Sequence, residues 1–170
     1  MTTYHTSQTV DAALVAFLKA QFPAYPVVRA FQHGMNGVVD GPAIEYFDVH
    51  YQQVGTPLRQ DVLNSDGLAF THTEIQRMSS TVQIQVSFGD SVPDLLLDVS
   101  MALQSDVAAA YFQGMDIAVE RVTDILTPRK SGDQDLFTIT PNFSIVLTFN
   151  KTQTTTVPVI TTVEFNAGRV

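Results

Sequence analysis

EIQRMSSTVQIQVSFGDSVPDLLLDVSMALQ, residues 74–104, is the stretch that decides the fold of this chain. Between Arg77 and Phe88 the even positions are mostly apolar and the odd positions are polar. This period of two is typical of a β-strand with one face on an apolar core and the other towards water or a neighbouring surface. The stretch therefore begins with a long, half-buried strand.

The second half of the same stretch predicts a helix. Gly89 is expected to end the strand, and Asp90 or Ser91 can cap the helix that follows. Pro93 fits the first helical turn, and Asp94 follows Ser91 at the spacing of a capping box. The helix then carries an apolar stripe that can lie back on the sheet: Val92, Leu95, Leu96, Val99 and Leu103. Strand and helix together predict the centre of one α/β domain.

Similar patterns along the rest of the chain predict the other elements. A first helix is expected over Ser7–Phe22, and a second short one over Val107–Phe112, capped at Ser105–Asp106 and closed by Gly114. Further strands are expected over Pro26–Gln32, Ala43–Val54, Met115–Leu126, Phe137–Phe149 and Val157–Phe165, with a turn at Lys151–Thr156. The prediction is a single α/β (α+β) domain over residues 1–170. Its sheet is mixed and mostly antiparallel, with about five or six strands and two or three helices on one face.

Gly55–Thr73 is the least regular part of the chain. It lies between two strands that would pair naturally, and it is too long for an ordinary connection. It is therefore either a projecting β-arm or a loop ordered by a partner. We favour the arm, because five of its residues are too apolar for a free loop: Leu58, Val62, Leu63, Leu68 and Phe70.

Composition limits the possible functions. The chain has 170 residues, of which 45% are hydrophobic, so it can bury a sizeable core. Its net charge is −8 and its longest basic run is Arg129–Lys130, which argues against tight binding of a phosphate backbone. Charged residues make up only 15% of the chain, a composition that favours extensive protein–protein surface. No apolar run approaches the roughly 20 residues of a membrane span, and the N-terminus lacks the regions of a signal peptide.

The residues that usually carry chemistry show no catalytic or metal-binding pattern. There is no cysteine, and the four histidines have no zinc-type spacing. His50 shares strand parity with Asp48, and His72 lies two residues before Glu74, so each imidazole could meet a carboxylate. No serine stands in a nucleophile motif. We therefore expect no catalytic residue, no metal site and no cofactor.

The order of elements resembles the tail-terminator or neck proteins of long-tailed bacteriophages. The matching segments are Val10–Leu18, Val27–Gln32, Gln76–Gly89, Phe143–Phe149 and Val157–Ile160. The resemblance implies a small structural subunit of the virion, assembled in the host cytoplasm into a homo-oligomeric ring, expected to be a hexamer. Such rings cap the tail tube at its head-proximal end and offer a docking surface to the head or neck.

The resemblance also implies the partners. These are further copies of the chain, the tail tube protein, the sheath protein where the tail is contractile, and a neck or connector protein. DNA only passes through the lumen, which an acidic wall would allow, and no membrane is involved. We expect the arm and the Thr/Gln-rich face of the central strand to meet adjacent subunits, through these residues: Leu58, Val62, Leu63, Leu68, Phe70, Gln83 and Gln85.

Other readings remain open at this point. Within the virion, the chain could be a head-closure or connector protein, or a tail-completion factor. In another class, it could be a small-molecule-binding domain or an enzyme whose site the sequence does not reveal.

Overall fold

The computed structural model describes residues 7–30, 41–87, 92–126 and 141–159. The elements in chain order are α1 (Ser7–Gln21), β1 (Val27–Arg29), β2 (Ala43–Leu63), β3 (Ala69–Ser87), α2 (Val92–Leu103), α3 (Asp106–Gln113), β4 (Ile117–Val122) and β5 (Asn142–Pro158). They form an open five-stranded sheet in the order β1-β2-β3-β5-β4. Only β1 and β2 pair in parallel, so the sheet is mixed and mostly antiparallel, as predicted.

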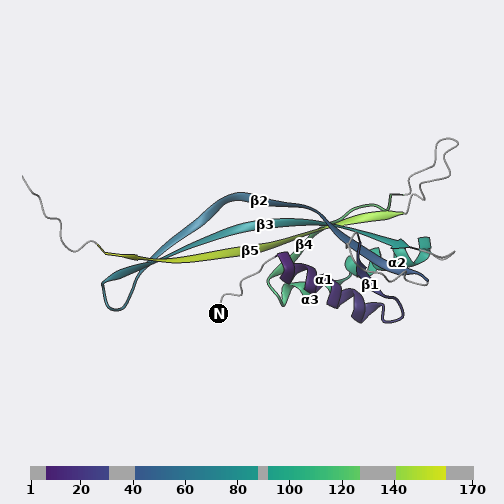
Figure 1. Ribbon diagram of the computed structural model, residues 1–170, viewed down its shortest axis with the longest axis horizontal. Coiled ribbons are helices and arrows are strands. Elements are labelled where there is room, and N and C mark those ends of the chain that lie inside the picture. Colours follow the sequence, from purple (N-terminus) through teal and green to yellow (C-terminus); the bar gives the residue numbers. More distant parts are fainter. Residues whose placement is uncertain (1–6, 31–40, 88–91, 127–140, 160–170) are drawn as a thin grey trace, which may run out of the picture.

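The molecule has two parts of different construction (Figure 1). At one end, the three helices lie against one face of the sheet; we call this part the body. From there β2, β3 and β5 continue together as a narrow three-stranded ribbon, which we call the arm and define as residues 54–77 and 150–158. The predicted projecting β-arm is therefore present. It is longer than the predicted Gly55–Thr73, and β5 runs along its whole length as a third strand.

The core lies between the helices and the sheet of the body. The predicted alternation of β3 is confirmed, because Val82, Ile84 and Val86 are fully buried. The stripe of α2 packs on the same core through Leu95, Leu96, Val99 and Leu103, as predicted, and α1 does so through Val10, Leu14, Phe17 and Leu18. Phe17 also stacks on α3, with its ring centroid 5.3 Å from that of Tyr111 and 5.5 Å from that of Phe112. Aromatic contacts at this distance add to the stabilisation from burial.

The helix ends agree only partly with the sequence analysis. At the start of α3, the Ser105 hydroxyl accepts a hydrogen bond from the Ala108 amide at 3.2 Å, so the predicted cap is confirmed. Gly114 at its other end is right-handed, with φ −61°, and the left-handed residue is Asp116 with φ 57°. Gly114 therefore ends α3, as predicted, and the left-handed residue at which the chain reverses lies two positions later. The predicted caps of α2 at Asp90 or Ser91 lie outside the described residues.

The largest error of the sequence analysis concerns the last strands. Lys151–Thr156 is not a turn, and Val157 does not begin a separate strand, because β5 pairs with β3 without a register shift from Asn142 to Pro158. The threonines of this segment are β-branched and suit a strand even where no core lies beneath them. β4 is also shorter than predicted: it has a register shift between Val119 and Arg121 and ends at Val122, and beyond it only an isolated bridge joins Leu126 to Asn142. Residues 137–140 of the predicted strand lie outside the described part of the chain.

Candidate assembly surface

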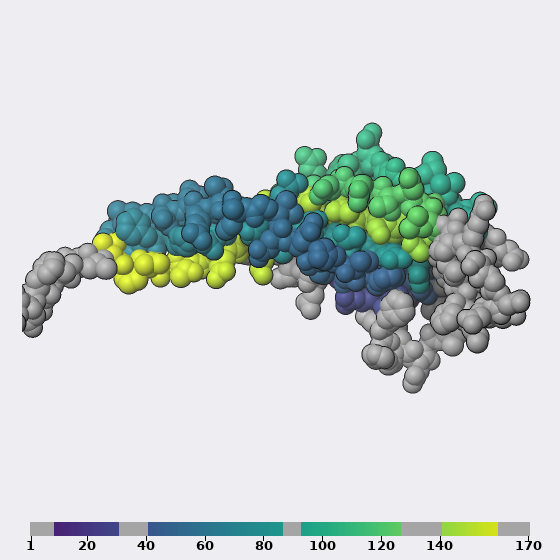
Figure 2. All heavy atoms as spheres, turned by 90° about the horizontal axis from the view of Figure 1, so that it is seen from above, coloured from purple at the N-terminus to yellow at the C-terminus, as the bar shows by residue number. Residues whose placement is uncertain are grey.

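The arm exposes apolar side chains that have no core to pack on. None of the described helices reaches it, and Figure 2 shows it as a slender extension of the body. Among the described residues, most of the large hydrophobic side chains that remain exposed belong to it: Val54, Leu58, Val62, Leu63, Leu68, Phe70 and Val157. A ribbon of three strands without a packed layer has little stability of its own. Exposed apolar surface of this kind is a candidate site for binding another protein.

Three of these residues form one row across the arm near its tip. Leu63 is the register partner of Phe70, and Phe70 is the partner of Val157. Their exposed fractions are 52%, 39% and 48%. Phe70 and Val157 also border a shallow depression with Asp61 and His72. The row offers a partner an apolar strip three strands wide.

Next to this row, on the same face, lies a small network of charges. His72 contacts Asp61 through Nδ1 at 2.5 Å and Glu74 through Nε2 at 3.4 Å. Glu74 Oε1 also forms an ion pair with Arg59 Nε, at 2.9 Å. Hydrogen bonding to Asp61, and then to Glu74, raises the pKa of His72. The predicted contact of His72 with a carboxylate is therefore confirmed, and the network is exposed enough to reorganise on binding.

The corresponding prediction for His50 is wrong. A register shift between Asp48 and His50 places Asp48 opposite Val82 and His50 opposite Thr81. Adjacent residues of β3 point to opposite faces of the sheet, so the two side chains point away from each other. A β-bulge of this kind cannot be inferred from strand parity alone.

The two outer edges of the arm differ. Along β2 the pairing with β3 shifts twice, and the second shift lies between Val54 and Leu58, where Gly55 has φ 71° and Pro57 lacks an amide donor. Beyond Leu58 the edge is regular as far as Leu63. The pairing of β5 with β3 has no shift, and β4 covers the outer edge of β5 only as far as Phe149. Within the described residues, both edges of the outer arm therefore present unpaired backbone groups.

The two glutamines predicted at the subunit interface lie in the body, on the face opposite the helices. Gln83 and Gln85 are half-buried by neighbouring strands. The Gln85 amide donates a 2.6 Å hydrogen bond to Glu45 Oε2 on β2. The structure thus brings the five predicted arm residues together on the ribbon and places the two glutamines at a distance from them. Whether any of the seven contacts another subunit stays a prediction.

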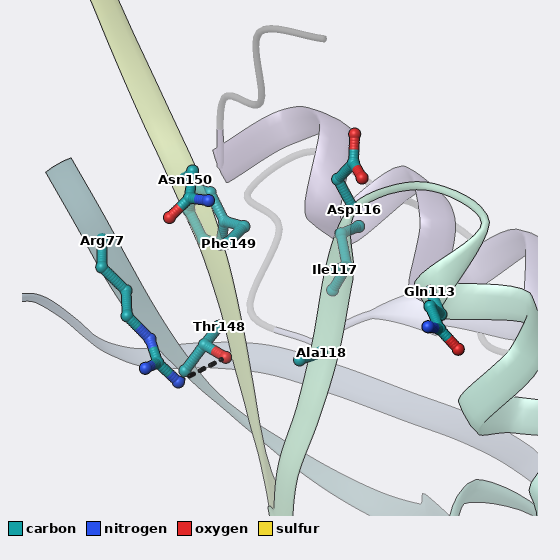
Figure 3. A pocket seen from close by; sticks show the side chains of 8 residues that line it. All are labelled: Arg77, Gln113, Asp116, Ile117, Ala118, Thr148, Phe149 and Asn150. Carbon is teal, nitrogen blue, oxygen red and sulfur yellow. Dashed lines mark hydrogen bonds between the residues drawn. The ribbon is translucent and has the colours of Figure 1, made fainter. Parts of the chain in front are cut away.

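A groove lies where the arm leaves the body (Figure 3). Its volume is about 310 Å³, and β3, β5, α3 and the start of β4 supply its lining. The Arg77 guanidinium donates a 3.5 Å hydrogen bond to Thr148 Oγ1, Asn150 is the register partner of Arg77 on β5, and Asp116 lies across the groove, just before β4. The groove offers charged and amide groups for binding, and its described lining includes no histidine, cysteine or serine that could form a nucleophile–base pair.

A polar cluster that the sequence did not reveal lies within the body, between α1 and β2. Asp11 on α1 is 9% exposed, and the Tyr51 hydroxyl lies 3.2 Å from its Oδ1 and 3.0 Å from Asp48 Oδ1. One hydroxyl proton cannot serve both carboxylates at once. Asp48 has an ion pair with Arg29, whereas burial, with Asp48 nearby, raises the pKa of Asp11 to about 6. The available signal was Asp11 itself, an acid bordering the apolar stripe of a helix.

Within the described ranges, no group of three or more His, Asp or Glu side chains is arranged to hold a metal ion. No single helix there is long and apolar enough to cross a membrane, and only α2 and α3 taken together, with a bend of 54° between them, meet the criteria of length and composition.

A compact body with a long, coreless arm suits a structural protein that assembles with other proteins. A comparison with known protein families gives independent information. The family described as E217 gateway protein gp29 matches residues 7–159, and the chain belongs to this family. It is thus a phage structural protein of the head–tail junction and a component of the virion, which agrees with the coarser part of the predicted resemblance. A search of curated proteins found no match.

Proposed function

We propose that this chain forms a closed ring of identical subunits between the phage head and tail, expected to be a hexamer. One side of the ring docks on the head-proximal end of the tail, and the other meets the neck or connector. DNA passes through the lumen. In this position the ring also limits growth of the tail tube.

The arm is the observation that carries this proposal. The body completes its own core, with Phe17, Phe112 and Phe143 all 2% exposed or less. The arm leaves Leu58 and Leu68 more than 60% exposed and both of its outer edges open. A protein that folds through one part and exposes apolar surface on another is suited to contacts between subunits. When those contacts join different patches on each copy, they generate rings or filaments.

The charge of the chain agrees with a passage for DNA. The net charge is −8, and the stretch from Met78 to Glu120, which includes α2 and α3, contains acids but no lysine, arginine or histidine. A wall of this composition repels the phosphate backbone, so DNA could slide past it without being held.

The test is the native mass of a variant without the arm. Gln53 and Met78 are register partners, so an Asn-Gly turn can replace residues 54–77 and close a short hairpin. Ending the same variant after Phe149 removes the arm portion of β5. We expect the full chain to scatter light as a ring, either alone or after addition of tail tubes, and the armless chain to remain a monomer that melts cooperatively.

Val107→Ser is the matched control, because Val107 is an apolar residue that is 62% exposed on α3, in the body. It should leave the ring intact. A ring formed by the armless chain would assign assembly to the body instead. A full-length chain that stays monomeric with and without tail tubes would contradict the proposed function.

A further inference from the structure

We infer that the outer edge of β5 in one copy pairs with the outer edge of β2 in the next, with the arms side by side and pointing the same way. This inference rests on the proposed ring and specifies the contact that closes it. Each free edge thus pairs with a strand from a second copy of this chain, by strand addition.

Strand direction is the first argument. β2 is antiparallel to β3, and β3 is antiparallel to β5, so β2 and β5 both run outward along the arm. Joining unlike edges of two copies therefore keeps the arms parallel, and the new pair is a parallel one. Joining two β5 edges would instead relate the copies by a two-fold axis and point their arms in opposite directions. Only the first arrangement repeats around a ring.

The regularity of the edges is the second argument. Natural edge strands are usually blunted by bulges, prolines or charges. β2 has a bulge and a proline up to Pro57 and carries Arg59 and Asp61 beyond it, but the outer segments Leu58–Leu63 and Thr152–Val157 pair with β3 in an unbroken register. Thr152–Val157 contains no charged residue and four threonines. Both segments are thus left as templates for pairing, at matching positions along the arm.

The side chains on the two edges are compatible. Beyond Lys151, the edge of β5 has no ionised group. In any register, therefore, this edge brings no like charge against Asp61 or Arg59 on β2 of the next copy. In the unshifted register, Leu63 of one copy lies beside Val157 of the next. The row of Leu63, Phe70 and Val157 then continues from arm to arm as one apolar band. This explains why exposed apolar residues are aligned across the ribbon.

The experiment uses disulfide trapping, for which a chain without cysteine is well suited. Gln60 and Thr154 are aligned with Thr73 in one cross-strand row, so Cβ atoms at both positions point to the same face. Gln60→Cys is combined in turn with Thr152→Cys, Thr154→Cys or Thr156→Cys, which covers shifts of two residues in either direction. After mild oxidation, we expect at least one pair to give a ladder of linked subunits on non-reducing denaturing gels, up to the size of the ring.

Single-cysteine variants are the controls and should give no ladder. Dimers from Thr154→Cys alone would show β5 paired with β5 and overturn the inference. A second rival is docking of the arm on α2, where Leu97 and Met101 are exposed. A ladder from Leu97→Cys with Thr154→Cys, and none from the Gln60 pairs, would assign that contact instead.

Light scattering on the same samples tests the proposed ring separately from the pairing of its edges. Rings without a ladder from any Gln60 pair would overturn the edge pairing and leave the proposed function standing. The absence of rings would overturn both.

Discussion

The body and the arm use the same residue types in the same sheet with opposite results. Phe143, on the body portion of β5, is fully buried, whereas Phe70, on the arm portion of β3, is 39% exposed. The difference arises because α1, α2 and α3 cover one end of the sheet only (Figure 1). Burial of apolar surface stabilises the fold at one end. At the other end the same kind of surface stays available for association. Changes in the two regions should therefore have separable effects.

The largest effect is expected in the body. Phe112→Ala removes a fully buried ring that packs on Phe17 and Tyr111. Loss of such a ring leaves a cavity and costs about 3–5 kcal/mol. Urea denaturation of the armless chain measures this cost without a contribution from assembly. A loss below about 1 kcal/mol would mean that the helical layer is not the source of stability.

The matching change in the arm should act on assembly and not on folding. Phe70→Ala removes the middle of the exposed apolar row, so we expect the ring to dissociate at a subunit concentration at least about tenfold higher, equivalent to about 1.4 kcal/mol. Analytical ultracentrifugation over a dilution series measures the shift. The unfolding midpoint of the dissociated monomer should hardly change. Val107→Ala, an exposed apolar change on α3, is the control. An equal shift in that variant would remove the distinction between arm and body.

The sequence predicted the body better than the arm, for a physical reason. The alternation of Val82, Ile84 and Val86 and the stripe of α2 record a core, and periodicity detects a core. The arm portion of β5 has no core beneath it, so Thr152–Thr156 shows no such pattern and resembles a turn in sequence. The apolar residues from Leu58 to Phe70 were the available signal of an arm, because their number is unusual for a loop. Pairing across the chain, as between Asp11 and Tyr51, has no local signature.

The smallest expected effect concerns the polar cluster around Asp11 within the body. The pKa of Asp11 is raised from 3.8 to about 6, so the folded chain holds this proton more tightly than the unfolded chain does. The stabilisation of the fold by this bound proton is therefore fully present below pH 3.8, and it is lost as pH rises through 6. Asp11→Asn cannot ionise, and its amide can donate to Asp48. This variant should abolish the decline in stability between these pH values. It should stabilise the chain at pH 7 by about 1 kcal/mol, because coupling to neighbouring charges spreads the effect of the pKa shift over several groups.

Thermal denaturation from pH 4 to 8 tests this directly, with Asp94→Asn, an exposed change on α2, as the control. If Asp11→Asn were less stable at pH 7, the Asp11 carboxylate would be needed as the acceptor for Tyr51, and its burial would be a favourable part of the fold. Because the cluster joins α1 to β2 within the body, either outcome should leave the mass of the ring unchanged. A change of ring mass with pH in the native chain, but not in Asp11→Asn, would instead mean that the body and the arm are coupled.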